Sequence, residues 1–74
     1  MGLTLKPKEL IKFLEKSGYK FVRTRGTSHK IYSNGSHSVS IPIHGGKEFN
    51  IEFIMTILQE TDLSKKKLLK YLNR

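Results

Sequence analysis

The chain has 74 residues, enough for a single small domain over residues 1–74 and too few for a second one. Its 14 lysines and arginines outnumber its 6 acidic residues, and the formal net charge of +8 predicts an acidic partner, with nucleic acid first and an acidic protein second. The absence of cysteine excludes disulfides and thiolate metal sites, and no apolar run approaches the roughly 18–20 residues of a membrane span.

A first helix is predicted from Pro7 to about Lys16 or Ser17. Proline suits the first turn of a helix, where its missing N–H costs no hydrogen bond. Gly18 is the expected stop, because glycine readily adopts the left-handed conformation that ends many helices. The apolar stripe of this helix comprises Leu10, Ile11 and Leu14, with Phe13 at its edge.

Three strands are predicted next, at Tyr19–Thr24, Ser28–Ser33 and about His37–Ile43. Gly26 interrupts the first two as a turn or bulge. The pair Asn34-Gly35 predicts a two-residue type I′ hairpin turn. The third strand alternates apolar and polar residues, which indicates one buried face and one wet face.

This hairpin turn predicts which side chains share a face of the sheet. With Asn34 and Gly35 as the loop, His29 pairs with Ser40 and Lys30 pairs with Val39. If Val39 points into the core, Lys30 lies on the core side and His29 lies on the open face, whereas a three-residue loop would invert both. The same register puts Tyr32 on the core side and Ile31, Ser38, Ser40 and, by parity, His44 on the open face.

Two further helices complete the predicted order. Asn50 is the expected N-cap of one helix and Ser64 that of a short last helix. Their apolar faces comprise Ile51, Ile54, Met55 and Leu58 in the first, and Leu68, Leu69 and Leu72 in the second. The order helix, three antiparallel strands, helix and helical tail predicts an α+β fold with helices on one face of an open sheet.

The run from Arg23 to Tyr32 carries the chemistry, because it places His29 among Arg23, Arg25 and Lys30. Histidine exchanges protons near neutral pH, and arginine and lysine attract phosphate. On an open sheet face, His29 is a candidate general acid or base against a phosphate backbone. The alternative is an ordinary polar residue of an exposed strand, and sequence chemistry alone does not decide between the two.

The other histidines are weaker candidates. His44 is either a second proton donor or phosphate contact, or a plain loop histidine, and His37 beside the hairpin turn is expected to be exposed. No two histidines stand at the i, i+4 spacing of a helical metal site, and no carboxylate cluster completes a ligand set. We therefore expect neither a metal nor another cofactor.

Three stretches of the chain resemble the HicA-type toxins, the ribonuclease partners of HicA–HicB toxin–antitoxin pairs. They are residues 9–19 of the opening helix, Gly26–Tyr32 with its Ser28-His29 pair, and Ile41–Glu48 with its Pro42-x-His44 pattern. The family joins glycine, serine and histidine directly, whereas Thr27 stands between Gly26 and Ser28 here. A bulge can absorb such an added residue.

The resemblance implies a fold like that of double-stranded-RNA-binding domains and metal-independent endonucleolytic cleavage of mRNA, with His29 as the catalytic residue. It also implies a HicB-like antitoxin as partner. The absence of cysteine and of a long apolar run favours a cytoplasmic protein that engages no membrane. The residues expected to contact RNA are Arg23, Arg25, Ser28, Lys30, His44 and Lys47. Two alternatives stay open: a non-catalytic module that binds double-stranded RNA, and a protein that acts mainly by docking another protein.

Overall fold

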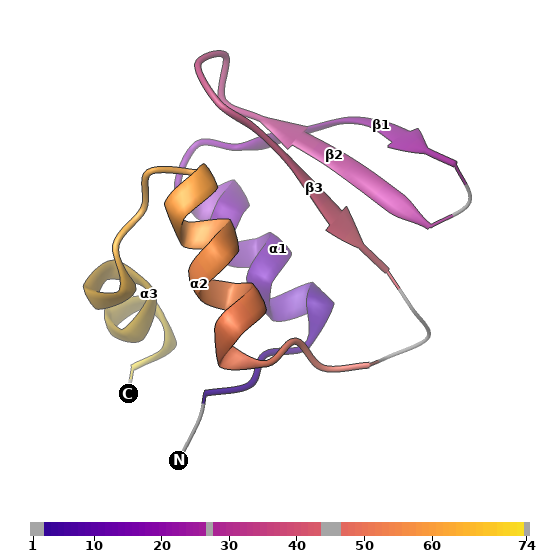
Figure 1. The fold of residues 1–74 in the computed structure, drawn as a ribbon. Helices are drawn as coiled ribbons and strands as arrows, with labels where there is room; N and C mark the ends of the chain where they lie inside the picture. Colours follow the sequence, from indigo (N-terminus) through magenta and orange to yellow (C-terminus); the bar gives the residue numbers. More distant parts are fainter. Residues whose placement is uncertain (1–2, 27, 44–46, 74) are drawn as a thin grey trace.

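The computed structural model describes residues 3–26, 28–43 and 47–73. Three strands form one antiparallel sheet in the order β1-β2-β3, and the helices lie on one side of it (Figure 1). The elements are α1 (Pro7–Lys16), β1 (Lys20–Arg25), β2 (His29–Ser33), β3 (Ser38–Pro42), α2 (Ile51–Glu60) and α3 (Lys65–Leu72). This confirms the predicted α+β fold class, an open three-stranded sheet in the α-β-β-β-α order of double-stranded-RNA-binding domains with a short helix added.

Local side-chain chemistry sets the helix ends at the predicted positions. The Asn50 side chain accepts a hydrogen bond from the Phe53 N–H at 2.9 Å, and Ser64 Oγ accepts one from the Lys67 N–H at 3.1 Å. Both bonds satisfy donors that a helix N-terminus leaves unpaired. At the end of α1, Gly18 has φ +100°, a conformation that glycine adopts without the penalty of a Cβ atom. No helix in the described ranges is both long and apolar enough to cross a bilayer.

The core lies between the helices and the face of β2 and β3 that is turned toward them. Tyr19 is 1% exposed and its hydroxyl donates to the Thr61 carbonyl at 3.0 Å, which joins the start of the sheet to the end of α2. Burial raises the pKa of Tyr19, and the charge of Asp62 adds a smaller effect in the same direction. The pKa of Tyr32 is raised by burial and, to a smaller extent, by the charge of Glu15. The buried apolar side chains are Leu5, Leu10, Phe13, Leu14, Tyr19, Tyr32, Val39, Ile41, Ile54, Ile57, Leu58 and Leu68.

Two apolar stripes differ from the prediction by about one residue around the helix. Phe13 is buried and Ile11 only half-buried, the reverse of the expected order. In α2, Ile57 is buried, whereas Met55 is 42% exposed. The mean periodicity of a helix predicts the apolar side, but the docking angle against the sheet decides which flank of that side is covered.

The hairpin turn lies one residue later than predicted. Gly35 and Ser36 are its central residues, and Gly35 has φ +95°. Asn34 flanks the turn instead of lying in it: its N–H donates to the His37 carbonyl at 3.1 Å, and its Oδ1 accepts from the His37 N–H at 2.7 Å. An asparagine side chain can bond the backbone ahead of it in this way, which displaced the predicted turn.

The predicted pairing of β2 with β3 is therefore wrong by two residues, but the predicted faces are right. His29 lies opposite Pro42 instead of Ser40, and Lys30 lies opposite Ile41 instead of Val39. A shift of two residues preserves the alternation of faces. His29 and Ser40 thus remain on the open face, and Lys30 remains on the side of the helices.

A β-bulge at Val22 interrupts β1, at a place where the sequence analysis predicted a regular strand. Phe21 lies opposite Tyr32 and Arg23 lies opposite Ile31, so Val22 is the extra residue between them. Beyond the bulge, Arg25 lies opposite His29. The bulge reverses the alternation of β1, and this reversal turns Arg23 and Arg25 toward the open face.

Candidate active site

His29 is the first residue of β2, the central strand, and its side chain is exposed. It lies opposite Arg25 of β1 on one side and opposite Pro42 of β3 on the other. The backbone pairing continues one residue further, since the Ile43 N–H donates to the Ser28 carbonyl at 2.7 Å. His29 is therefore held by both neighbouring strands, and a rigid backbone determines the direction of its side chain.

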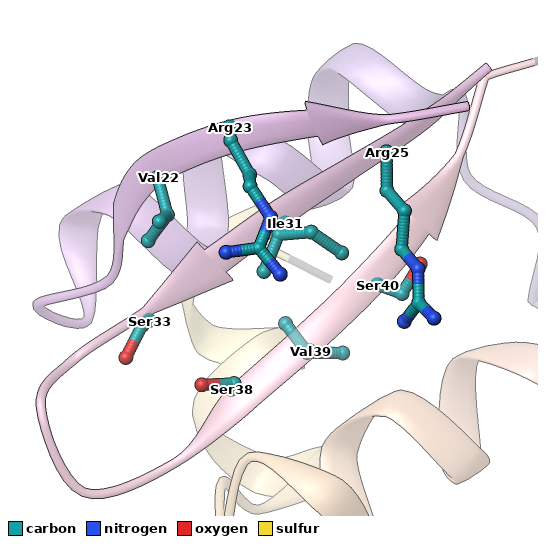
Figure 2. Close-up of a pocket in the computed structure, with 8 residues that line it drawn as sticks. All are labelled: Val22, Arg23, Arg25, Ile31, Ser33, Ser38, Val39 and Ser40. Atoms are coloured by element: carbon teal, nitrogen blue, oxygen red, sulfur yellow. The ribbon is translucent and has the colours of Figure 1, made fainter. Parts of the chain in front are cut away.

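The two arginines of β1 share this face with His29. Arg23 lies opposite Ile31, and Arg25 lies opposite His29 itself. In Figure 2 both side chains extend from β1 over the open face of the sheet. Because residues directly opposite each other in an antiparallel pair point to the same side, the imidazole and the two guanidinium groups present themselves together to solvent.

A shallow concavity of about 410 Å³ lies in this face, open to solvent (Figure 2). Its floor is partly apolar, because the half-buried Ile31 lies beside Val22, which is 51% exposed. Its rim carries the two arginines and three serine hydroxyls. The residues that line it are Val22, Arg23, Arg25, Ile31, Ser33, Ser38, Val39 and Ser40.

A second concavity of about 350 Å³ adjoins the first and contains His29. It is lined by Arg25, Gly26, His29 and Ser40, so it shares Arg25 and Ser40 with the first concavity. Together the two form one continuous surface, here called the open-face site. This site combines two cations and hydroxyl donors, which suit the binding of phosphate groups, with an imidazole, a side chain that can transfer protons.

Acidic groups are absent from the open-face site, as far as the described lining residues show. In the described part of the chain, no three His, Asp or Glu side chains gather closely enough to hold a metal ion. The lining therefore favours an anionic ligand that contacts the arginines directly.

The other predicted RNA contacts lie elsewhere. Lys30 lies on the helix side of the sheet and lines a separate concavity with Lys6, Lys8 and Lys12 of the N-terminal region. The sheet thus separates Lys30 from His29, although the two are adjacent in sequence. Lys30 is nevertheless exposed, because a lysine stem can lie along apolar surface and leave its ammonium group in water.

Ser28, Lys47 and His44 complete the predicted set. Ser28 is half-buried directly before β2, and Lys47 is exposed beyond β3. His44 lies outside the described residues, and so does Thr27, for which a bulge was suggested. The bulge that the structure does show is at Val22, five residues earlier in the chain.

Sequence reasoning did not assign Val22, Ile31 or Ser33 to the site. The sequence analysis placed the apolar Ile31 on the open face, but a single exposed apolar side chain is common on protein surfaces and does not by itself mark a binding site. Val22 carried no signal in the sequence. Ser38 and Ser40 were placed on the open face, and both line the site there.

The comparisons with known proteins identify the family. The model of the family described as "HicA toxin of bacterial toxin-antitoxin" matches residues 7–63, which is most of the 74-residue chain. The search of the curated proteins found no match, and the search of the solved structures found none either. The matched region includes α1, the whole sheet and α2, and therefore the entire open-face site. The chain belongs to the HicA toxin family, so it is the toxin of a toxin–antitoxin pair and has a cognate antitoxin as partner.

Proposed function

We propose that this toxin is an endoribonuclease that cleaves mRNA without a bound metal ion, with His29 as its general acid and base. The observation that supports the proposal most is the common orientation of His29, Arg23 and Arg25 on one open sheet face. Membership of the HicA family supports it as well. In the same proposal, the cognate antitoxin is a HicB-like protein.

The reaction begins at the ribose. His29 removes the proton of a 2′-hydroxyl group, and the resulting oxygen attacks the adjacent phosphorus. The bond from phosphorus to the 5′-oxygen of the next nucleotide breaks, which yields a 2′,3′-cyclic phosphate and a 5′-hydroxyl end. The leaving oxygen takes its proton from water, from His44 or from the protonated His29. DNA lacks the attacking hydroxyl and is not a substrate.

The arginines act on the phosphate. Negative charge grows on the non-bridging oxygens as the phosphorus becomes five-coordinate, and guanidinium groups offer paired N–H donors that match two such oxygens. Arg25 lies directly opposite His29 and is the better placed to contact the phosphate under attack. Arg23 lies two residues before Arg25 in β1 and contacts the neighbouring phosphate.

The remaining predicted contacts have supporting roles in the proposal. Ser28 and Lys47 contact RNA near the end of the sheet where His29 lies. Lys30 adds attraction from the opposite face, because an ammonium group acts on phosphate as a point charge. None of these three residues touches the reacting atoms.

Cleavage of purified RNA in EDTA tests the proposal. His29→Ala should reduce the rate by about 10²–10⁴-fold, the usual contribution of a positioned acid–base group, while the folded state and RNA affinity are retained. His37→Ala is the matched control, because His37 is also exposed but lies beside the hairpin turn. This control should cleave at the wild-type rate.

Three results would contradict the proposal. Undiminished cleavage by His29→Ala would exclude the assigned catalytic residue, and equal loss in the His37→Ala control would show that the effect is not specific to His29. RNA that is bound but never shortened would favour the non-catalytic module that binds double-stranded RNA. A chimeric strand with a single ribose in DNA checks the chemistry, since it should be cut only after that ribose.

A further inference from the structure

A second cationic concavity lies between α1 and α3, away from the open-face site. It has a volume of about 430 Å³ and is called the α3 groove here. Lys16 lines it from α1, and Lys67 and Lys70 line it from α3. All three lysines are exposed, and no acidic side chain is among the described residues that line the groove. The groove therefore concentrates positive charge that the described lining does not neutralise.

An aromatic ring is part of the same surface. Tyr71 of α3 is 38% exposed, and its ring stands 5.5 Å from that of the buried Phe13, with an angle of 55° between the planes. The contact with Phe13 holds the tyrosine ring in place and leaves part of it open to solvent. Cations beside an exposed aromatic ring are typical of surfaces that hold single-stranded nucleic acid.

Helix α3 is short, but a buried side chain and a capped first turn attach it to the rest of the fold. Leu68 is fully buried, and Ser64 caps the first turn by accepting from the Lys67 N–H. The helix contributes four of the chain's lysines in eight residues, and it begins after residue 63, where the family match ends. Figure 1 shows α3 at the side of the helical layer that is remote from the sheet.

We propose that the α3 groove is a second binding site for the RNA substrate: Lys16, Lys67 and Lys70 hold phosphates, and a base stacks on Tyr71. This inference rests on the proposed ribonuclease function, because it takes the same RNA as the ligand. The groove lies apart from His29, so it affects capture of a long RNA and leaves the chemical step unchanged.

The binding experiment uses the His29→Ala protein in EDTA, so that the RNA stays intact. The RNA is a single strand of about 30 nucleotides; with phosphates at least ~3.4 Å apart, it exceeds the longest dimension of the molecule, 33 Å. The test variant carries Lys67→Gln and Lys70→Gln. The matched control carries Lys65→Gln and Lys66→Gln, which remove the same charge from the same helix but not from the groove.

The groove variant should bind this RNA about 3- to 30-fold more weakly, and the slope of log affinity against log salt should fall by about 1.4, or about 0.7 per lost phosphate contact. The control should change affinity less than twofold, roughly what a pure change in net charge gives. Lys16→Gln, on α1, should weaken binding in the same direction, which keeps the test valid if the α3 variants fold poorly. Tyr71→Ala should cost about 5- to 100-fold.

The length of the RNA separates this proposal from the proposed function. With active protein and an RNA of about 4 nucleotides, too short to reach both sites, the groove variant should cleave at the wild-type rate. With the long RNA its KM should rise while kcat is unchanged. A groove variant that binds long RNA like the control overturns the second site, even if wild-type cleavage is normal. Weaker binding of the cognate antitoxin with unchanged RNA binding would also overturn it, because the groove would then serve a protein.

Discussion

Deletion of a single residue in β1 tests whether the bulge at Val22 determines the orientation of the two arginines. Deletion of Val22 removes the extra residue, so Arg23 follows Phe21 directly and still lies opposite Ile31. Both arginines keep their places on the open face, in a regular ladder. We expect this variant to retain kcat/KM for RNA cleavage within about twofold.

Deletion of Thr24 should have the opposite result. If the bulge persists, Arg25 moves opposite Lys30 and turns toward the helices; if the bulge disappears, Arg23 takes that position instead. In either arrangement one guanidinium group leaves the open-face site. A hydrogen bond to a charged group contributes about 1.5–3 kcal/mol when shielded and less when exposed. Both arginines are exposed, so we expect a loss of about 1–2 kcal/mol, or about 5- to 30-fold in kcat/KM.

Steady-state cleavage of one defined RNA measures both effects, and circular dichroism establishes that each variant is folded. Arg23→Ala and Arg25→Ala serve as references, because the Thr24 deletion should match one of them. Two folded proteins with equal losses would refute the reasoning, since the argument depends on a difference between deletions two residues apart. Full activity after the Thr24 deletion would refute it as well.

Three further predictions concern the folded state. Tyr19→Phe removes the hydroxyl that donates to the Thr61 carbonyl, and calorimetry should show a loss of about 1 kcal/mol and about 4–8 °C in Tm. Burial raises the pKa of both Tyr19 and Tyr32 above the unfolded value. The contribution of these two groups to stability is therefore complete below about pH 10 and is lost as the pH rises through the raised values. Urea unfolding at stepped alkaline pH should show this loss of stability, and a flat profile would contradict it. Asn50→Ala leaves the Phe53 N–H without its cap and should cost about 0.5–2 kcal/mol, whereas Asn50→Asp should cost little.

Features of the fold that depend on local chemistry could be predicted from the sequence. Asn50 and Ser64 cap their helices as expected, because a short polar side chain before an apolar run satisfies free N–H groups within its own turn. Gly18 ends α1 for an equally local reason. Features that depend on packing between elements were predicted less well. Ile57 is buried where Met55 was predicted to be, because the burial of a helix flank depends on how the helix docks against the sheet.

The same distinction between locally determined and packing-dependent features applies to the residues of the site. The face of His29 was predicted correctly although the hairpin turn was misplaced by one residue, because moving a two-residue turn by one position changes every cross-strand partner by two. Only a change in turn length would have turned His29 toward the core. The arginines had no such protection: one bulged residue changes the alternation by one, and no turn-forming residue marks Val22 in the sequence. A strictly regular β1 in register with Phe21 would have put Arg23 opposite Lys30, on the helix side of the sheet and therefore on the face opposite to His29. The cationic half of the proposed active site therefore depends on a backbone irregularity, and the activity of the two deletion variants is its most direct measure.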